Sequence, residues 1–235
     1  MKRRSGSHFL VATGAAALAY MLVIRPRLLS WGATEAEVLR PMPGDEYVPH
    51  PRIESTRSIT IQAPAADVWP WLVQIGYQRA GWYSYDLLEK AIGVADFVDG
   101  RSARRIIPEL QHLQVGDIIK TDPGGGFLVA AVEPARLLAL RARIDAFTGR
   151  HRGLSEPLRG ACFDISWVFT LHEIDRHSTR LTVRFRAGYR PSLPNRLIAR
   201  LVFEPVIFFM ERKMLLGLKE RAEGAWALST QADVA

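Results

Sequence analysis

The stretch that decides the fold is residues 194–222, PNRLIARLVFEPVIFFMERKMLLGLKERA. Its apolar residues recur at steps of three and four, which places them on one face of a helix. That face consists of Phe203, Ile207, Met210, Met214 and Leu218, and it is widened by Val202, Val206 and Phe209. A helix this apolar must bury most of its surface, so other parts of the chain have to pack against it and cover it.

Pro205 interrupts this helix. Proline has no backbone N–H and removes a helical hydrogen bond, so we expect a kink there. The residues after Pro205 are apolar on nearly every side, and we expect them to lie deepest under the cover. Glu204 and Glu211 are seven residues apart and fall roughly on one face. We expect both to face solvent or to pair with arginines, because an inward position would strongly perturb them.

The cover is predicted to be a sheet, because apolar and polar residues alternate upstream with the period of two that strands have. A first short strand is expected at 58–62, and the later strands at 117–121, 127–133, 136–143, 163–173 and 180–189. In the last strand, Leu181, Val183 and Phe185 alternate with arginines that include Arg184 and Arg186. One sheet face is therefore expected to be apolar and the other wet, as in an antiparallel sheet covered on one side.

Two short helices are expected between the first strand and the later ones. One opens after Ala63-Pro64 and ends by Gly76, and the other runs from about Tyr85 to Ile92. The order of strand, two helices, about five strands and a long helix indicates an α+β fold. In this helix-grip arrangement, a curved antiparallel sheet of about six strands wraps around the long C-terminal helix. The two short helices close one end.

The chain is expected to have four parts. They are an N-terminal membrane anchor at 1–27, a helix and proline-rich connector at 28–56, a helix-grip ligand-binding domain at 57–225 and a tail at 226–235. The anchor rests on an apolar run at 9–24 that has basic residues at both ends and the length of a short spanning helix. A single-pass anchor in the cell membrane is the preferred interpretation. A cleaved signal peptide and a buried helix are the alternatives.

The charge distribution argues against nucleic acid as a partner. The chain has 235 residues and a formal net charge of +7. Five basic residues and no acid fall within 1–27, so only +2 of the +7 belongs to the rest of the chain. The membrane is therefore the expected partner besides a ligand. The single cysteine, Cys162, allows no intramolecular disulfide and is expected to be a buried, unreactive side chain.

Several motifs resemble those of a known superfamily. Residues 59–69, ITIQAPAADVW, are similar to the opening strand–helix step of the START-like, pollen-allergen-like helix-grip superfamily, also called SRPBCC or polyketide cyclase/dehydrase-like. The motifs WGAT at 31–34, PGDE at 43–46, YSYD at 83–86 with Glu89, and IPEL at 107–110 resemble an uncharacterised bacterial branch. The resemblance covers residues 31–222. It implies an internal apolar cavity for a lipid, sterol, polyketide or other hydrophobic molecule, in a superfamily where some members are cyclases or dehydratases and many only bind and carry.

Binding of a hydrophobic small molecule between the sheet and the C-terminal helix is therefore the function expected first. Methionine is common in adaptable apolar pockets, and this helix is rich in it. The residues expected to contact the ligand are Trp69, Trp167, Phe169, Phe185, Phe203, Ile207, Met210 and Met214. No cofactor and no metal is expected, because the six histidines show no close ligand spacing.

A cyclase- or dehydratase-type enzyme that uses the same cavity is the less favoured alternative. Its candidate catalytic residues are Tyr83, Tyr85, Asp86 and Glu89, two phenols and two carboxylates that could do acid–base work at a cavity mouth. The plainer interpretation is that Asp86 complements a helix N-terminus and Glu89 is solvated. The motifs of the superfamily give no catalytic residue to carry over.

A non-catalytic interaction module is the third possibility. Its contact surface would be the wet sheet face that carries Arg184 and Arg186. The basic loop at 145–161 is long and interrupted by glycines, and it acts either as a binding lid or as a solvated loop.

Overall fold

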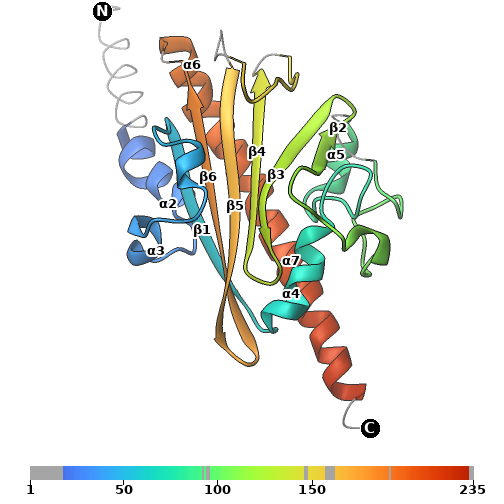
Figure 1. The fold of residues 1–235 in the computed structure, drawn as a ribbon. Helices are drawn as coiled ribbons and strands as arrows, with labels where there is room; N and C mark the ends of the chain where they lie inside the picture. Colours follow the sequence, from blue (N-terminus) through green and yellow to red (C-terminus); the bar gives the residue numbers. More distant parts are fainter. Residues whose placement is uncertain are drawn as a thin grey trace, which may run out of the picture.

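The structure, a computed structural model, describes residues 18–91, 93, 96–145, 148–156, 162–190 and 192–232. Its helices are α2 (Arg25–Leu29), α3 (Glu35–Leu39), α4 (Ala65–Val73), α5 (Asp86–Ala91), α6 (Leu193–Ile198) and α7 (Glu204–Ala232). Its strands are β1 (Ile53–Ile61), β2 (Ile118–Asp122), β3 (Gly125–Glu133), β4 (Leu137–Asp145), β5 (Cys162–Asp175) and β6 (Ser178–Tyr189). This order confirms the α+β class (Figure 1).

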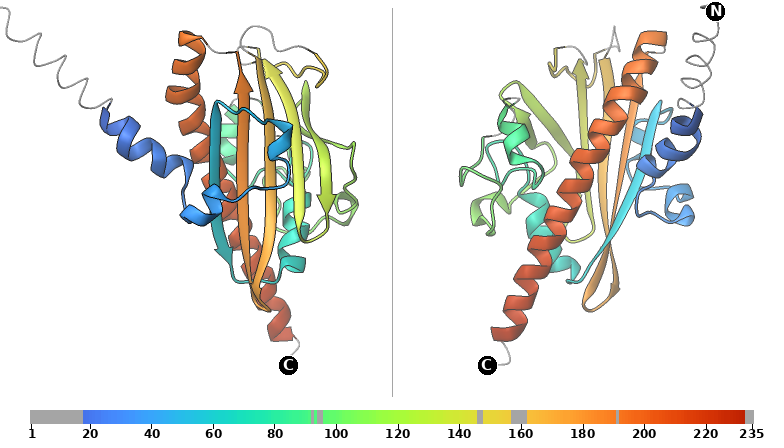
Figure 2. Two further views of the ribbon diagram at one scale, coloured as in Figure 1. Left: turned by 60° about the vertical axis from the view of Figure 1, so that its left-hand side comes forward. Right: turned by 180° about the vertical axis from the view of Figure 1, so that it is seen from behind.

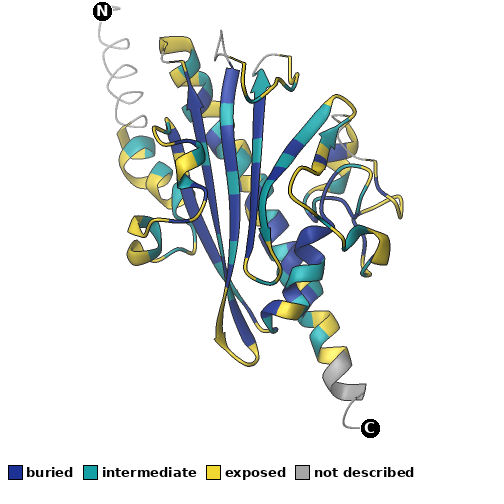
Figure 3. Cartoon of the chain, in the orientation of Figure 1, coloured by how far each residue is buried: buried dark blue, intermediate teal, exposed yellow. Residues whose placement is uncertain are grey.

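The six strands form one antiparallel sheet in the order β1-β6-β5-β4-β3-β2. The predicted number of strands is confirmed. β1 begins earlier than expected, because residues from Ile53 onward pair with β6 from Ala187. β2 and β3 are joined by a tight connection and form a hairpin. The central strands are buried along most of their length (Figure 3), and Cys162 is 1% exposed, as expected.

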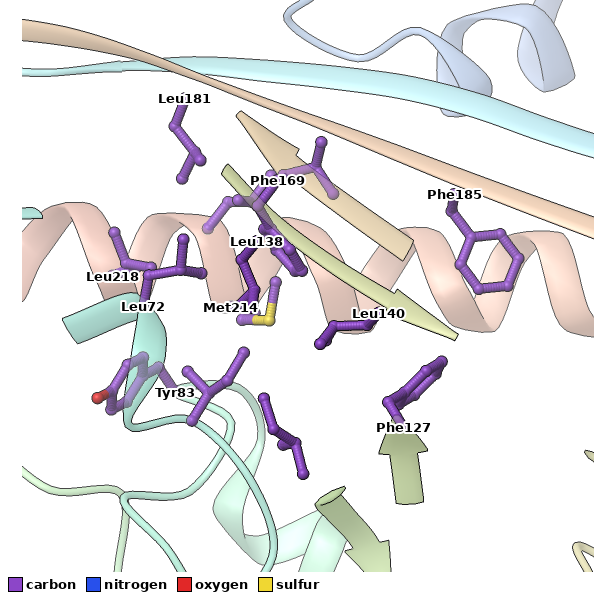
Figure 4. Packing of buried hydrophobic residues seen from close by; sticks show 14 of the residues in the cluster. Leu72, Tyr83, Phe127, Leu138, Leu140, Phe169, Leu181, Phe185, Met214 and Leu218 are labelled. Atoms are coloured by element: carbon purple, nitrogen blue, oxygen red, sulfur yellow. The ribbon is translucent and has the colours of Figure 1, made fainter. Parts of the chain in front are cut away.

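The long helix α7 lies obliquely across one face of the sheet, as the back view in Figure 2 shows. Its residues Met214, Leu215 and Leu218 are at most 2% exposed. They belong to the same core as Phe169 of β5 and Leu138 of β4 (Figure 4). Burial of each large apolar side chain contributes roughly 1.5–3 kcal/mol, so this layer contact is a main source of stability. The helix-grip arrangement is therefore present.

The irregularity expected at Pro205 takes the form of a wide helical turn. Residues Ala199–Phe203 form a π turn that joins α6 to α7, and the Glu204 N–H donates to the Ala199 carbonyl five residues back. Pro205 has no N–H to complete a normal turn, and the backbone widens directly before it.

The expectation that the segment after Pro205 lies deepest is wrong. Val206 and Phe209 are 54% and 55% exposed, whereas Leu215 and Leu218 are fully buried. The sheet covers only one side of the helix, so apolar residues on the other side remain in solvent (Figure 2). The deepest part of α7 lies one to two turns farther along, where α4 also packs on it.

The second face of the sheet is covered as well, so the prediction of a wet face is wrong. Arg184 is only 3% exposed. Its guanidinium donates to the Thr56 hydroxyl, the Asp45 carboxylate and the backbone carbonyls of Glu37, Val38 and Arg40. Arg186 forms ion pairs with Asp45 and Glu54. The N-terminal segment crosses this face (Figure 2, left), and an interaction surface built on Arg184 and Arg186 is therefore excluded.

The covering segment is held by a capping box. The Thr34 hydroxyl accepts from the Glu37 N–H, and the Glu37 carboxylate accepts from the Thr34 N–H. α3 is a short helix of five residues within the expected helix and connector at 28–56. Glu37 also pairs with Arg180 of β6 at 2.7 Å. The hydrogen bonds from Arg180 lower the pKa of Glu37 to about 2, so the Glu37–Arg180 ion pair stays charged at neutral pH.

The predicted location in the cell membrane is wrong. Residues 1–17 of the expected anchor lie outside the described residues. Within the part of the chain that the structure describes, no helix has the length and apolar character needed to cross a bilayer. The end of the apolar run instead packs beside α7. There the Tyr20 hydroxyl donates to the Arg200 carbonyl at 2.8 Å, and Arg25 pairs with the buried Glu204 at 2.6 Å.

Candidate functional site

A cavity of about 290 Å³ lies between the inner face of the sheet and α7. Its lining residues are Trp82, Ser84, Glu89, Thr121, Asp122, Phe127, Trp167, Phe185, Ile207, Met210, Glu211 and Met214. A smaller cavity of about 150 Å³ adjoins it and shares Phe185 and Ile207 as lining. Because strand residues alternate between faces, the inward side chains of β3, β5 and β6 meet the same stretch of helix.

Aromatic rings build the apolar wall of the cavity. The ring centroid of Trp167 lies 5.9 Å from that of Trp82 and 5.4 Å from that of Phe127. On its other side, Phe169 lies 4.8 Å away. Rings at these separations attract one another beyond the gain from buried area alone. Trp167 is thus fixed at the centre of a four-ring cluster, with two of the rings bordering the cavity beside it.

A buried ion pair closes one side of the cavity. Arg57 of β1 is 1% exposed and Glu211 of α7 is 3% exposed. The Arg57 guanidinium donates to one Glu211 carboxylate oxygen, and the Trp167 Nε1–H donates to the other at 3.1 Å. Arg57 also donates from Nε to the Leu28 carbonyl and lies over the Phe208 ring. Both carboxylate oxygens of Glu211 are therefore occupied, which is the condition under which a buried charge is tolerated.

Glu89 of α5 is the opposite case. It is 0% exposed, and neither carboxylate oxygen has a hydrogen-bond partner of normal geometry among the described residues. Burial raises the pKa of Glu89 to about 7, the Asp86 carboxylate adds to the rise, and the Tyr85 backbone N–H opposes it. Buried polar groups are usually paired, so an unpaired carboxyl on a cavity wall is a candidate functional group.

The remaining polar lining comes from the hairpin of β2 and β3. The Thr121 hydroxyl lies 3.1 Å from His151 Nε2, and the Asp122 carboxylate lies 3.5 Å from the same nitrogen. Asp122 also accepts from the Gly124 backbone N–H at 2.6 Å. His151 belongs to the predicted 145–161 loop and here packs on the hairpin. No group of three or more His, Cys, Asp or Glu side chains that could hold a metal occurs within the described ranges.

Replacing Glu89 by glutamine is expected to change how stability depends on pH. The folded-state pKa of about 7 lies above the ordinary value of 4.5, so the folded state holds this proton more tightly than the unfolded state. The contribution is complete below about pH 4.5 and is lost as the pH rises to about 7. At pH 8, Glu89→Gln should therefore have a higher free energy of unfolding in urea than wild type. The difference should be up to about 3 kcal/mol, and screening by solvent lowers it.

The matched control for this prediction is Glu109→Gln, because Glu109 is exposed. Its stability curve should run parallel to that of wild type between pH 4.5 and 8. If the Glu89→Gln curve also ran parallel to wild type, Glu89 would not be the buried, proton-holding group described above.

The residues predicted to contact a ligand are divided by the structure. Trp167, Phe185, Ile207, Met210 and Met214 line the main cavity. Phe203 lines the adjoining one, while Phe169 lies behind Trp167 and is fully buried. Trp69 packs against the core and lines neither cavity. Whether the lining residues contact a ligand remains a prediction.

Among the predicted catalytic candidates, only Glu89 lines the cavity. The Asp86 carboxylate accepts from the Ser102 N–H and hydroxyl. The Tyr83 hydroxyl donates to the Trp71 carbonyl and accepts from Gln74, and burial raises the pKa of Tyr83. Tyr85 is 41% exposed. The plain interpretation of Glu89 as a solvated residue is wrong.

Sequence reasoning missed the Arg57–Glu211 pair. Glu211 was expected to face solvent or pair with an arginine, and the pairing part of this expectation is confirmed. Sequence spacing does not connect the two residues, because Arg57 lies 154 positions from Glu211. A signal did exist, since Arg57 alternates with the apolar Ile59 and Ile61 and so shares their face of β1.

No protein-family model matches the chain. No curated protein matches it either. Several solved structures do. A hypothetical protein from Helicobacter pylori matches with a TM-score of 0.45 and 11% identity, over 77% of this chain and 95% of its own. A conserved protein from Geobacillus kaustophilus matches with a TM-score of 0.41 and 14% identity, over 74% of this chain and 97% of its own. The Zhui aromatase/cyclase from Streptomyces sp. R1128 matches with a TM-score of 0.37 and 16% identity, over 73% of this chain and 93% of its own. Likeness at this level carries no information on what this chain binds or does.

Proposed function

We propose that this protein binds a hydrophobic small molecule in the cavity between the sheet and α7. The observation that carries the proposal is the lining itself, in which four aromatic rings face two methionines and an isoleucine. The pocket leaves about 290 Å³ of free space in front of this apolar lining. Ligand sites are concave and mostly apolar with a few placed polar groups, as this one is.

The dimensions favour a small guest. Ligand pockets commonly range from roughly 300 to 1,000 Å³, and this cavity lies at the lower end. The smaller cavity shares the lining residues Phe185 and Ile207 with it. A molecule of one or two fused rings, or a short branched chain, suits the main cavity alone.

Filling the cavity is expected to abolish binding. Purified protein should be extracted with organic solvent and the extract examined by mass spectrometry. Ile207→Trp places an indole into the shared lining and should reduce the recovered compound at least tenfold. Val206→Trp is the matched control, because Val206 is the neighbouring residue and is 54% exposed. Equal recovery from both variants, or no compound from wild type beyond a blank purification, would contradict the proposal.

A second candidate function is acid–base catalysis on the bound molecule. The observation that favours it is Glu89, a buried and unpaired carboxyl with a pKa of about 7 that can either give or take a proton near neutral pH. Incubating the extracted compound with fresh protein should then yield a product of altered mass. Glu89→Gln should form no product, even at a compound concentration that saturates its cavity. A compound that returns unchanged from wild type would leave binding as the function.

A further inference from the structure

Among the described residues, the charged side chains that line the main cavity are all acids. They are Glu89 from α5, Asp122 from β2 and Glu211 from α7. No lysine or arginine from the described ranges belongs to this lining. An apolar pocket selects the polar end of its occupant through its few polar groups, because each unpaired group costs free energy. The charges of this lining therefore restrict the class of guest.

Two of the three acids already have partners. Glu211 is held by Arg57 and Trp167, as described above. Asp122 accepts from the Gly124 N–H and lies 3.5 Å from the His151 ring. Of the three, only the Glu89 carboxylate has no hydrogen-bond partner of normal geometry among the described residues, although Glu89 is 0% exposed. The carboxyl group of Glu89 is thus the lining acid that is left for a ligand to pair with.

The surroundings of Glu89 favour a positive partner. On the same helix, the Asp86 carboxylate repels a charge on Glu89. Lys90 is next in sequence, but its ammonium is committed to the Gly100 carbonyl at 2.7 Å. From the other elements, Asp122 and Glu211 face the cavity, with His151 and Arg57 as their respective partners. A carboxylate on the guest would add a further negative charge here, whereas an ammonium would offset one.

We propose that the occupant is an apolar molecule carrying a protonated amine, with its ammonium group against Glu89 and its apolar body between Trp167 and α7. This inference rests on the proposed binding function and specifies its ligand class. An ammonium supplies N–H donors to both free carboxylate oxygens and a charge that is worth most where water is excluded. The two hydroxyls of the lining, Ser84 and Thr121, accept or donate within the protein and leave this role to the guest.

The test compares three probes that share one ring system. 1-Naphthylmethylamine, 1-naphthalenemethanol and 1-naphthoic acid are titrated into the full chain by isothermal titration calorimetry at pH 6 and pH 8. The amine should bind at least tenfold more tightly than the alcohol at pH 8, and the acid should bind least. Because Glu89 has a pKa of about 7 and must be ionised to pair with the ammonium, amine affinity should fall about tenfold from pH 8 to pH 6. The affinity of the alcohol should change less than threefold.

Two variants assign the effect to one carboxyl group. Glu89→Gln should remove both the preference for the amine and its pH dependence, while the alcohol binds as in wild type. Asp122→Asn, which alters another acid of the lining and its contact with His151, should leave both features in place. A pH dependence that survived in Glu89→Gln and vanished in Asp122→Asn would overturn the inference.

The remaining outcomes separate this inference from the proposed function. If the acid or the alcohol bound as tightly as the amine, the cavity would still bind apolar molecules, and only the amine preference would be overturned. If none of the three probes bound and solvent extraction recovered no compound, both the inference and the proposed function would be overturned.

Discussion

Replacing Glu211 by leucine is expected to lower the free energy of unfolding by about 3–5 kcal/mol, because it leaves the Arg57 guanidinium buried without a counter-charge. The pair is almost completely enclosed, at 1% and 3% exposure, so solvent cannot take over the role of the lost partner. The same change removes the acceptor of the Trp167 indole N–H. Urea unfolding followed by circular dichroism measures the effect, and the slope of the transition shows whether unfolding remains two-state.

The matched control is the double variant Arg57→Met with Glu211→Leu. Replacing both partners of a buried ion pair by apolar groups of similar volume is often neutral or stabilising. The double variant should therefore regain most of the stability lost in Glu211→Leu, and this recovery separates an uncompensated charge from a packing defect. A double variant at least as unstable as the single one would show that the pair matters for its shape and not for its charge.

Replacing Arg184 by methionine is expected to cost a similar amount, about 3–5 kcal/mol, for a different reason. The guanidinium of Arg184 makes five hydrogen bonds, three of them to the carbonyls of residues 37, 38 and 40. Methionine fills the space but donates nothing, so several buried acceptors lose their partners, each at about 1–3 kcal/mol before relaxation. Arg184→Lys should recover only part of the loss, because an ammonium cannot reproduce the planar fork.

Hydrogen exchange locates the effect of Arg184→Met. The amides of residues 35–47 should lose protection before those of the sheet, since this arginine ties the covering segment to β6. Arg176→Met is the control, because Arg176 lies exposed in the turn between β5 and β6. Uniform loss of protection across the whole chain in Arg184→Met would show that the covering segment is not a separately held unit.

The elements that could be predicted from sequence are those with a strong period. The alternation from Leu181 to Tyr189 gives β6, and the three- and four-residue steps after Phe203 give α7. Both signals arise because one side of each element is buried, and the period reports which residues share that side. The six strands and α7 can be predicted from these periods.

The parts that could not be predicted involve pairings between distant segments. A period tells which face Arg184 lies on, but it does not tell what covers that face. The covering segment is bound to Arg184 largely through the backbone carbonyls of residues 37, 38 and 40. Every residue has a backbone carbonyl, so this contact requires no particular side chains and leaves no recognisable sequence pattern. The proline-rich stretch was therefore interpreted as a connector. For the same reason, Glu89 looked solvated, because its burial depends on a loop and a sheet that are remote in sequence.

The contact between Trp82 and Trp167 has a consequence for spectroscopy. Two indoles with centroids 5.9 Å apart couple their ultraviolet transitions, and coupled transitions produce a pair of circular dichroism bands of opposite sign. Both rings border the cavity, so a molecule that enters and tilts either one changes the sign pattern or the splitting of these bands. The protein thus carries an unlabelled optical reporter of its own occupancy, which Trp82→Phe should silence.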